Sequence, residues 1–261
     1  MSSRRLPFAI STVAVGTYLF MHLPLVVLIA FSFNRSRFGV QWGGFTLDWY
    51  ARLASRPDIL RALRMSLVVG LLSTLLATVI GTLAALALAR HLPRARRAAG
   101  ELLYLPIVTP EIVAGVSLLV LFSWLGIGLG ITTIVIAHTA FSIPFVTVVV
   151  LARLQGTDRA LEEAAMSLGA DEFSTFRRVT LPQLMPGVLA GALLAFTLSF
   201  DDFVTTFFVS GVGSTTLPLA VYSMVRKSVE PSINALSALL VVVTTVAVYL
   251  ADRLARGSTR A

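Results

Sequence analysis

Long apolar segments separated by polar ones constrain this chain more than any other feature. A bilayer core needs about 20 mostly apolar residues per helix. The 261-residue sequence contains such windows at 9–33, 66–89, 102–125, 131–152, 186–208 and 233–250. Proline residues at the start of the third window predict kinked early turns there. The sequence therefore predicts an all-α, polytopic membrane protein with six transmembrane helices.

The composition supports this interpretation. Apolar residues make up 56% of the chain and charged residues only 13%, against roughly 25% charged in soluble domains. A soluble core could not bury so many apolar side chains, so lipid must cover most of the surface. The chain has no cysteine, which excludes a disulfide framework and a thiol nucleophile. Its three histidines show no metal-ligand spacing, and we expect neither a metal site nor a catalytic site.

Basic residues predict the orientation, because cytoplasmic flanks of transmembrane helices normally hold the excess of Lys and Arg. With both termini in the cytoplasm, 13 of the 21 basic residues lie inside. The bias is moderate, since the first external segment, 34–65, is itself rich in arginine. A cleaved signal peptide is the alternative for the first span, but its apolar run is too long and lacks a small-x-small exit site. The basic cluster Arg90–Arg97 indicates attraction to anionic membrane lipid rather than to nucleic acid.

The segment 153–185 is the least hydrophobic part of the chain and is predicted to be a cytoplasmic loop. Asp158 can cap a helix that begins near Arg159. Gly169 should end that helix by adopting a left-handed conformation. The loop is either a docking element for a protein partner or an interfacial hairpin lying on lipid headgroups.

A second short helix is expected in this loop, from about Asp171 to Arg178. Pro182 and Pro186 then predict a break before the fifth span. Within that span, Gly187 and Gly191 favour close helix packing, inside the bundle or against a second membrane subunit.

Part of this loop has a long and specific spacing. Glu163-Ala164-Ala165 is followed at fixed intervals by Gly169, Val179 and Leu181-Pro182. This pattern resembles the EAA loop of binding-protein-dependent ABC importer permeases, with Val179 where isoleucine is usual. The resemblance implies that the loop is a coupling helix, which docks on a cytoplasmic ATPase. The implied coupling residues are Glu162, Glu163, Ala164, Ala165, Gly169 and Glu172.

No nucleotide-binding motif accompanies this loop. The phosphate-binding pattern G-x-x-x-x-G-K-[ST] is missing from the sequence, and the nearest glycine-rich stretch, Gly211–Ser214, lacks the lysine. We therefore expect no enzyme activity and no cofactor bound by this chain. ATP and magnesium would be bound by a partner ATPase.

Three acids lie within the predicted spans, which contain no Lys or Arg: Glu111, Asp201 and Asp202. An ionised carboxylate near the bilayer centre costs at least about 2.5–3.5 kcal/mol, so such residues face a bundle interior or a water-filled path. They could cap helix ends or pair with arginines of a partner subunit. They could also relay protons or bind a metal cation. We favour a third interpretation, in which they line a path for an organic cation.

Further segments extend the resemblance along the chain. They are SFNRSRFG (32–39), GFTLDWY (44–50), TPEIVAGVSLLVLF (109–122), FTLSFDDFV (196–204), LPLAVYSMV (217–225) and PSINALS (231–237). Together they resemble the C-type permease subunits of spermidine/putrescine ABC importers. The resemblance implies the MetI-like fold of type I ABC importer permeases, with residues 1–261 as a single transmembrane domain in the bacterial inner membrane. It also implies a substrate path that draws on Trp49, Glu111, Ser199, Asp201 and Asp202, with Glu172 of the cytoplasmic loop as a further candidate.

The implied partners are a homologous second permease, two ABC ATPase subunits, an extracytoplasmic polyamine-binding protein and the polyamine itself. Glu111 stands where the family often has aspartate, which keeps the charge but lengthens the side chain. Trp49 could add a cation–π contact to an ammonium group, or it could simply belong to the aromatic belt at the membrane interface. His22 and His138 are expected to be neutral, hydrogen-bonded residues rather than ligands.

Two alternatives remain open at this stage. The EAA spacing does not specify cargo, so the chain could be an ABC importer permease for another solute. An ion-coupled secondary transporter is a second alternative, which the EAA spacing opposes.

Overall fold

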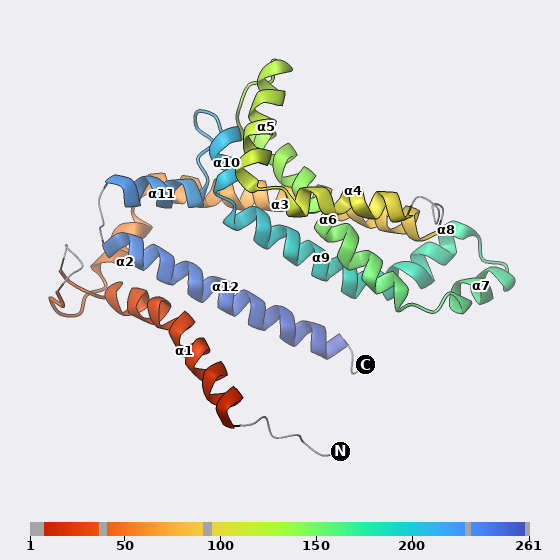
Figure 1. The fold of residues 1–261 in the computed structure, drawn as a ribbon, viewed down its shortest axis with the longest axis horizontal. Coiled ribbons are helices and arrows are strands. Elements are labelled where there is room, and N and C mark those ends of the chain that lie inside the picture. The colour runs from red at the N-terminus through yellow and green to blue at the C-terminus, as the bar shows by residue number, and fades with distance from the viewer. Residues whose placement is uncertain (1–7, 37–40, 91–95, 228–230, 259–261) are drawn as a thin grey trace. The chain divides into compact units, whose positions relative to one another are not determined.

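The computed structural model describes residues 8–36, 41–90, 96–227 and 231–258, and the described part is helical apart from its connections (Figure 1). The chain divides into two compact units, Met1–Leu60 with Val221–Ala261, and Arg61–Ala220. The helices are α1 (Phe8–Phe31), α2 (Asp48–Ala54), α3 (Pro57–Arg90), α4 (Arg96–Val108), α5 (Glu111–Trp124), α6 (Ile131–Gln155), α7 (Ala160–Ser167), α8 (Glu172–Thr175), the π-helical turn η1 (Phe176–Thr180), α9 (Leu181–Asp201), α10 (Val204–Val209), α11 (Leu217–Lys227) and α12 (Pro231–Ser258).

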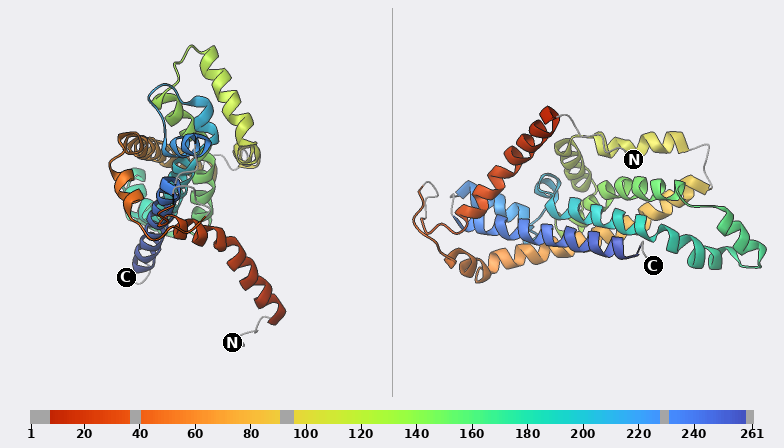
Figure 2. Two further views of the ribbon diagram at one scale, coloured as in Figure 1. Left: turned by 90° about the vertical axis from the view of Figure 1, so that its left-hand side faces the viewer. Right: turned by 90° about the horizontal axis from the view of Figure 1, so that it is seen from below.

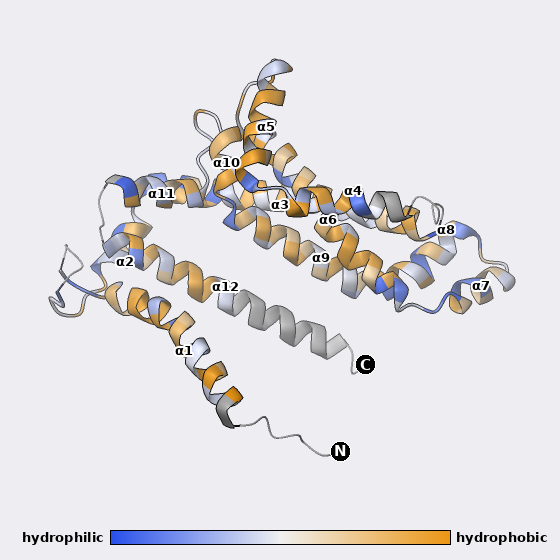
Figure 3. Cartoon of the chain, in the orientation of Figure 1, coloured by the Kyte–Doolittle hydropathy of each residue, from blue (hydrophilic) through white to orange (hydrophobic). Residues whose placement is uncertain are grey.

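The predicted spans have counterparts among these helices. In the described part of the chain, four helices are long and apolar enough to cross a membrane: Ile10–Phe31, Pro57–Arg90, Ile131–Gln155 and Glu172–Asp201. A bent pair, α4 with α5, gives a fifth span if the two helices cross the membrane as one broken span rather than as a re-entrant loop, and the described apolar part of α12 is shorter, Pro231–Thr245. Hydrophobic residues dominate the long helices in Figure 3. The predicted all-α, polytopic membrane protein is confirmed.

The third predicted span, 102–125, is not one continuous helix. Gly100–Val108 and Glu111–Trp124 meet at an angle of 100°. The bend lies at Thr109-Pro110, because a proline disfavours the helical conformation of the residue before it. Pro110 itself is extended, with φ −56° and ψ 129°. The prolines predicted a kink, and the structure has a sharp break that places Glu111 at the start of a new helix.

The fifth predicted span, 186–208, is wrong at both ends. A helix of 30 residues runs from Glu172 to Asp201 without interruption, so Pro182 and Pro186 do not break the chain. At Pro182 the π-helical turn just before it explains the continuity, because a wider turn relieves the clash between the proline ring and the preceding carbonyl groups, whereas Pro186 lies inside α9. At the other end, the helix stops at Asp201 and α10 begins at Val204.

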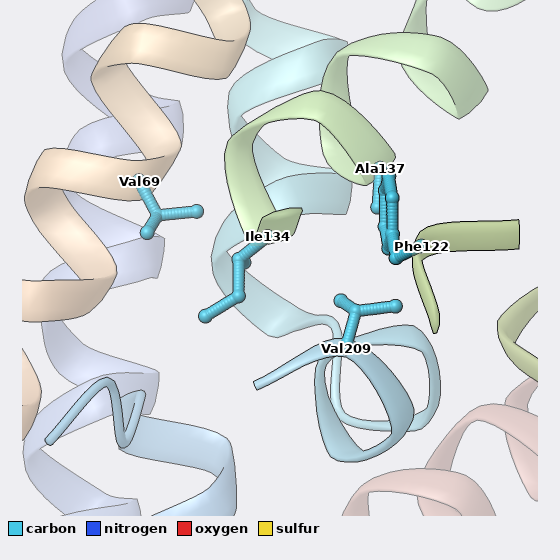
Figure 4. Packing of buried hydrophobic residues seen from close by; sticks show 5 residues of the cluster. All are labelled: Val69, Phe122, Ile134, Ala137 and Val209. Atoms are coloured by element: carbon cyan, nitrogen blue, oxygen red, sulfur yellow. The ribbon is translucent and has the colours of Figure 1, made fainter. Parts of the chain in front are cut away.

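The second unit, Arg61–Ala220, is built around α6. Figure 4 shows one of its buried clusters, in which α3, α5, α6 and α10 contribute Val69, Phe122, Ile134, Ala137 and Val209. A second cluster contains Ala77, Ala85, Val146, Val150 and Ala195. These side chains are almost completely buried. The core therefore runs along α6 and joins it to helices on several sides.

Helices α6 and α9 run side by side, in green and cyan in Figures 1 and 2. Glycines permit this approach. A Cβ atom at Gly187 would lie 2.6 Å from Cβ of Arg153, and one at Gly191 would lie 3.2 Å from Cγ1 of Val146. The predicted close packing at these glycines is thus confirmed inside the bundle, against α6.

The first unit contains α1, α2 and α12, and α12 packs against both of the others. Its loop is held by a backbone pairing between Asn34 and Phe45. The apolar window of α1 is not buried by any described part of the chain. In a membrane, lipid or another subunit must cover that surface.

We predict that Gly81→Ala destabilises the protein by about 1–3 kcal/mol, because overpacking strains a filled core. A Cβ atom at Gly81 would lie 2.8 Å from Cβ of Val146 and 3.1 Å from the carbonyl oxygen of Ile143. Thermal unfolding of the purified protein in detergent measures the change. Gly16→Ala in α1 is the control, since no described atom lies within 4 Å of that added Cβ. An equal loss of stability in both variants would contradict the packing argument.

Candidate transport path and coupling loop

Asp202 occupies the break between α9 and α10. Its backbone is extended, with φ −64° and ψ 122°. Its carboxylate accepts hydrogen bonds from the backbone N–H groups of Thr205 at 3.3 Å and Thr206 at 2.7 Å. The hydroxyl of Thr206 also donates to it, at 2.8 Å. Asp202 therefore caps α10, since it satisfies two N–H groups that a helix start leaves without intrahelical partners.

His138 of α6 joins Asp202 to α9. The imidazole is completely buried, and its Nδ1 lies 2.7 Å from Oγ of Ser199. Its Nε2 lies 2.9 Å from Oγ1 of Thr206 and 3.2 Å from Oδ2 of Asp202. The expectation that His138 is hydrogen-bonded is confirmed. His138, Ser199, Asp202 and Thr206 form one buried polar network at the junction of three helices, here called the His138 network.

Sequence reasoning missed this network. It searched the spans for Lys or Arg as partners of the acids and found none, whereas the partner is a histidine 64 positions earlier in the chain. The available signal was the position of His138 in an apolar span, because polar residues in a membrane usually face the bundle interior and pair with one another. Thr206 carried no comparable signal.

Asp201 and Glu111 differ from Asp202 in their surroundings. Both are exposed, and neither side chain makes a hydrogen bond or ion pair with any residue that the structure describes. Asp201 is the last residue of α9, and Glu111 is the first residue of α5, directly after the 100° bend. The structure thus places Ser199 and Asp202 together in a buried network and leaves Asp201 and Glu111 accessible. Their role in a substrate path stays a prediction.

Trp49 lies in α2, in the other unit, where it is largely buried. Its indole N–H donates a hydrogen bond to the carbonyl oxygen of Asn34 at 2.8 Å. The guanidinium carbon of Arg52 lies 5.0 Å from the ring centroid, within cation–π range. Arg52 thus supplies one cation–π contact to the ring, and the role of Trp49 in a substrate path stays a prediction. A pocket beside the ring is lined by Arg35, Thr46, Asp48, Trp49 and Arg52.

Residues 153–185, here called the coupling loop after their predicted role, have the local structure that the sequence predicts. The carboxylate of Asp158 accepts a hydrogen bond from the N–H of Ala160 at 2.9 Å, at the start of α7. Gly169 ends the helix with φ +90°, a conformation that few residues other than glycine adopt. The Ala170 N–H then bonds to the carbonyl oxygen of Ala165 at 3.1 Å. Glu163 and Ala164 are exposed on this helix, and Ala165 is partly buried.

Glu162 points the other way. Its carboxylate forms an ion pair with Arg90 at the end of α3 and accepts a hydrogen bond from the hydroxyl of Thr180 at 2.7 Å. The side chains are 15% exposed for Glu162 and 25% for Arg90. Glu162 therefore ties α7 to α3 and to the π-helical turn, whereas Glu163 faces outward. Sequence reasoning grouped these two glutamates, and only the structure separates them.

Glu172 begins α8 and belongs to the same loop. It is exposed. Its neighbour Asp171 is hydrogen-bonded to Ser174, which lowers the pKa of the Asp171 carboxyl below its ordinary value. Along a continuous helix, Glu172 and Asp201 are about 40 Å apart. The two acids therefore cannot belong to one binding site, and the position of Glu172 fits the coupling loop.

The chain is similar in sequence to known transport proteins. Residues 58–260 match the family model of the binding-protein-dependent transport system inner membrane component. The chain is 43% identical to the spermidine/putrescine transport system permease protein PotC of Escherichia coli (strain K12), covering 93% of this chain and 92% of the relative. It is 39% identical to PotC of Haemophilus influenzae, with 92% and 93% covered, and 39% identical to the putrescine transport system permease protein PotI of Escherichia coli (strain K12), with 95% and 92% covered.

Solved structures share the fold at low sequence identity. A bacterial ABC transporter involved in the import of the acidic polysaccharide alginate matches with a TM-score of 0.72 and 14% identity, over 94% of this chain and 95% of that one. The MetNI methionine ABC transporter in an inward-facing conformation matches with a TM-score of 0.60 and 18% identity, over 82% and 99%.

The helices and the coupling loop define a multi-pass membrane permease with the MetI-like fold of type I ABC importers. The chain belongs to the family of binding-protein-dependent transport system inner membrane components. The predicted fold and family are both confirmed.

We predict that Glu162→Ala lowers stability by about 1–3 kcal/mol, because it leaves Arg90 and Thr180 without their shared acceptor. Thermal unfolding of the purified protein measures the loss. The matched control is Glu163→Ala, one position along the same helix, which should change stability by less than about 0.5 kcal/mol because Glu163 is exposed. The assignment of Glu162 as a tether fails if the two variants unfold alike.

Proposed function

We propose that this chain is a permease subunit of an ATP-driven ABC importer that moves polyamines, such as spermidine and putrescine, across the bacterial inner membrane. The observation that carries the proposal is the identity of 39–43% with curated polyamine permeases over more than nine-tenths of the chain. In this proposal both termini lie in the cytoplasm, as the distribution of basic residues favours.

The chemistry of the predicted spans supports a cationic cargo. They contain three acids and no Lys or Arg. A polyamine is a flexible polycation, so acids spaced along a path can bind successive ammonium groups by charge-assisted hydrogen bonds. Asp201 and Glu111 are exposed and have no described partner, which suits this role. Asp202 and Ser199 would support the path indirectly, since their polar atoms form the hydrogen bonds of the His138 network.

The coupling loop supports an external source of energy. Beside the outward-facing Glu163, the loop exposes the apolar side chains of Leu161, Met166 and Leu168, the last of them 89% exposed. Such a surface is suited to a protein partner. We assign this partner as an ABC ATPase, two copies of which would bind ATP and magnesium. A homologous second permease and an extracytoplasmic polyamine-binding protein complete the proposed importer, and this chain itself would bind no cofactor.

Reconstitution tests the proposal. All subunits are placed in vesicles with ATP, and uptake of radiolabelled spermidine and putrescine is measured. ATP-dependent uptake of either polyamine is the expected result. A complex that hydrolyses ATP and moves a different solute would instead indicate an importer for that solute. Gradient-driven uptake by this chain alone would indicate an ion-coupled transporter.

We predict different results for the two adjacent aspartates. Asp201→Asn should raise the KM for polyamine uptake roughly two- to tenfold with little change in stability, because its carboxylate is exposed. Asp202→Asn should lower the thermal stability as well, because it weakens the cap of α10. Uptake assays paired with thermal unfolding separate the two effects. If the double variant, with both Asp201→Asn and Asp202→Asn, retains wild-type uptake, these two acids do not line the path.

We predict that Gly169→Asp abolishes uptake while the protein still inserts in the membrane. The substitution places a charged side chain at a positive φ on the coupling loop, where no described neighbour lies within 4 Å. Gly169→Ala is the control, because it brings the same backbone strain without the charge. We expect Gly169→Ala to retain part of the uptake. Normal uptake by Gly169→Asp in reconstituted vesicles would contradict the role of this loop.

A further inference from the structure

His138 is the buried titratable group that the proposed transport mechanism leaves without a role. Its side chain is completely buried, and both of its ring nitrogens lie within hydrogen-bond distance of side chains from α9 and α10. A buried polar side chain in a membrane protein is costly unless its hydrogen bonds are satisfied. The directions of those hydrogen bonds can be worked out from the chemistry of the partners.

The chain of hydrogen bonds begins at Asp202. An ionised carboxylate can only accept, so the hydroxyl of Thr206, 2.8 Å away, donates its single proton to Asp202. The Thr206 oxygen can then only accept from Nε2 of His138, 2.9 Å away. Nε2 must therefore carry a proton.

The state of Nδ1 follows from two further observations. Asp202 already has three donors, the N–H groups of Thr205 and Thr206 and the Thr206 hydroxyl, and Nε2 of His138 lies 3.2 Å from its Oδ2, so the carboxylate is hydrogen-bonded without a second proton on the ring. Among the described residues, the hydroxyl of Ser199 has no hydrogen-bond acceptor other than Nδ1, so its proton points at that nitrogen. A neutral ring protonated at Nε2 has a bare Nδ1, which accepts a hydrogen bond from the hydroxyl of Ser199 at 2.7 Å.

We propose that neutral His138 is a positioning residue of the transport path. It completes a one-way chain of hydrogen bonds that runs from Ser199 through His138 and Thr206 to Asp202. This chain fixes the geometry of the α9–α10 break, and it commits Asp202 to the cap of α10. Asp201, adjacent in sequence and exposed, is left as the carboxylate at the break that binds the cation. This last step rests on the proposed function.

The direction of the hydrogen-bond chain from Ser199 to Asp202 is tested without any transport assay. The complete complex is labelled with ¹⁵N-histidine, and its NMR spectrum is compared with that of a complex carrying His138→Gln. The difference isolates the His138 resonances. We expect a neutral ring with the proton on Nε2 and a bare Nδ1. An imidazolium, or a ring protonated at Nδ1 alone, would overturn the proposal.

The positioning role is tested by uptake kinetics. His138→Asn and Thr206→Val each interrupt the chain before Asp202, and each should raise the KM for polyamine roughly tenfold, as expected for one hydrogen bond in a chain that ends on a charged group. Because both substitutions interrupt the same hydrogen-bond chain, the double variant should have a KM no higher than that of either single variant. Additive effects, or an unchanged KM in His138→Asn, would contradict the proposal.

Two further variants act as controls. Asn and Gln both carry an amide N–H, but only the longer Gln side chain can place it near the position of Nε2 and donate to Thr206, so His138→Gln should restore most of the affinity that His138→Asn loses. His22→Gln alters a histidine whose hydrogen bond, within the described residues, is to the Tyr18 carbonyl of its own helix, and it should leave uptake unchanged. If the wild-type complex imports no polyamine, the proposed function fails, and the NMR result still decides the state of His138.

Discussion

Backbone hydrogen bonding in lipid is the constraint on which the rest of this structure depends. Every N–H and C=O group at membrane depth needs a protein partner or a water-lined cavity, so a helix cannot simply stop inside the bilayer. The fifth predicted span stops at Asp201 nevertheless, and the Asp202 carboxylate supplies the acceptors that the first N–H groups of α10 lack. His138, Ser199 and Thr206 then satisfy one another around that cap. An interrupted helix and a buried acid, each costly alone, stabilise each other.

Close packing makes this network possible. His138 reaches both α9 and α10 because α6 lies close against α9, at a distance that requires glycine at Gly187 and leaves little room for a Cβ atom at Gly191. At the contact between α3 and α6, Gly81 of α3 allows a similarly close approach to Val146 of α6. Small residues thus set the separation of the helices, and the polar network sets their register.

Local signals were sufficient to predict much of this fold and only part of its site. Hydropathy located the spans, and Asp158 and Gly169 gave the ends of the coupling helix, because caps depend on a few neighbouring residues. The continuous helix through Pro182 was not predictable in this way, since the π-helical turn before it leaves no clear pattern in sequence. Contacts between distant positions, His138 with Asp202 and Arg90 with Glu162, depend on tertiary packing that one sequence does not reveal.

One helix connects the two regions proposed to act in transport. The segment Glu172–Asp201 begins in the coupling loop and ends at the Asp201–Asp202 break, with no interruption along its 30 residues. Its first turns are tied through Thr180 to Glu162 of the coupling helix, and its last turn is tied through Ser199 to His138. A displacement of the coupling helix by a partner would therefore shift a stiff rod whose far end carries the exposed Asp201. The π-helical turn lies at Phe176–Thr180, beside the tether, so any bending of this rod is expected at the end nearest the loop rather than at the break.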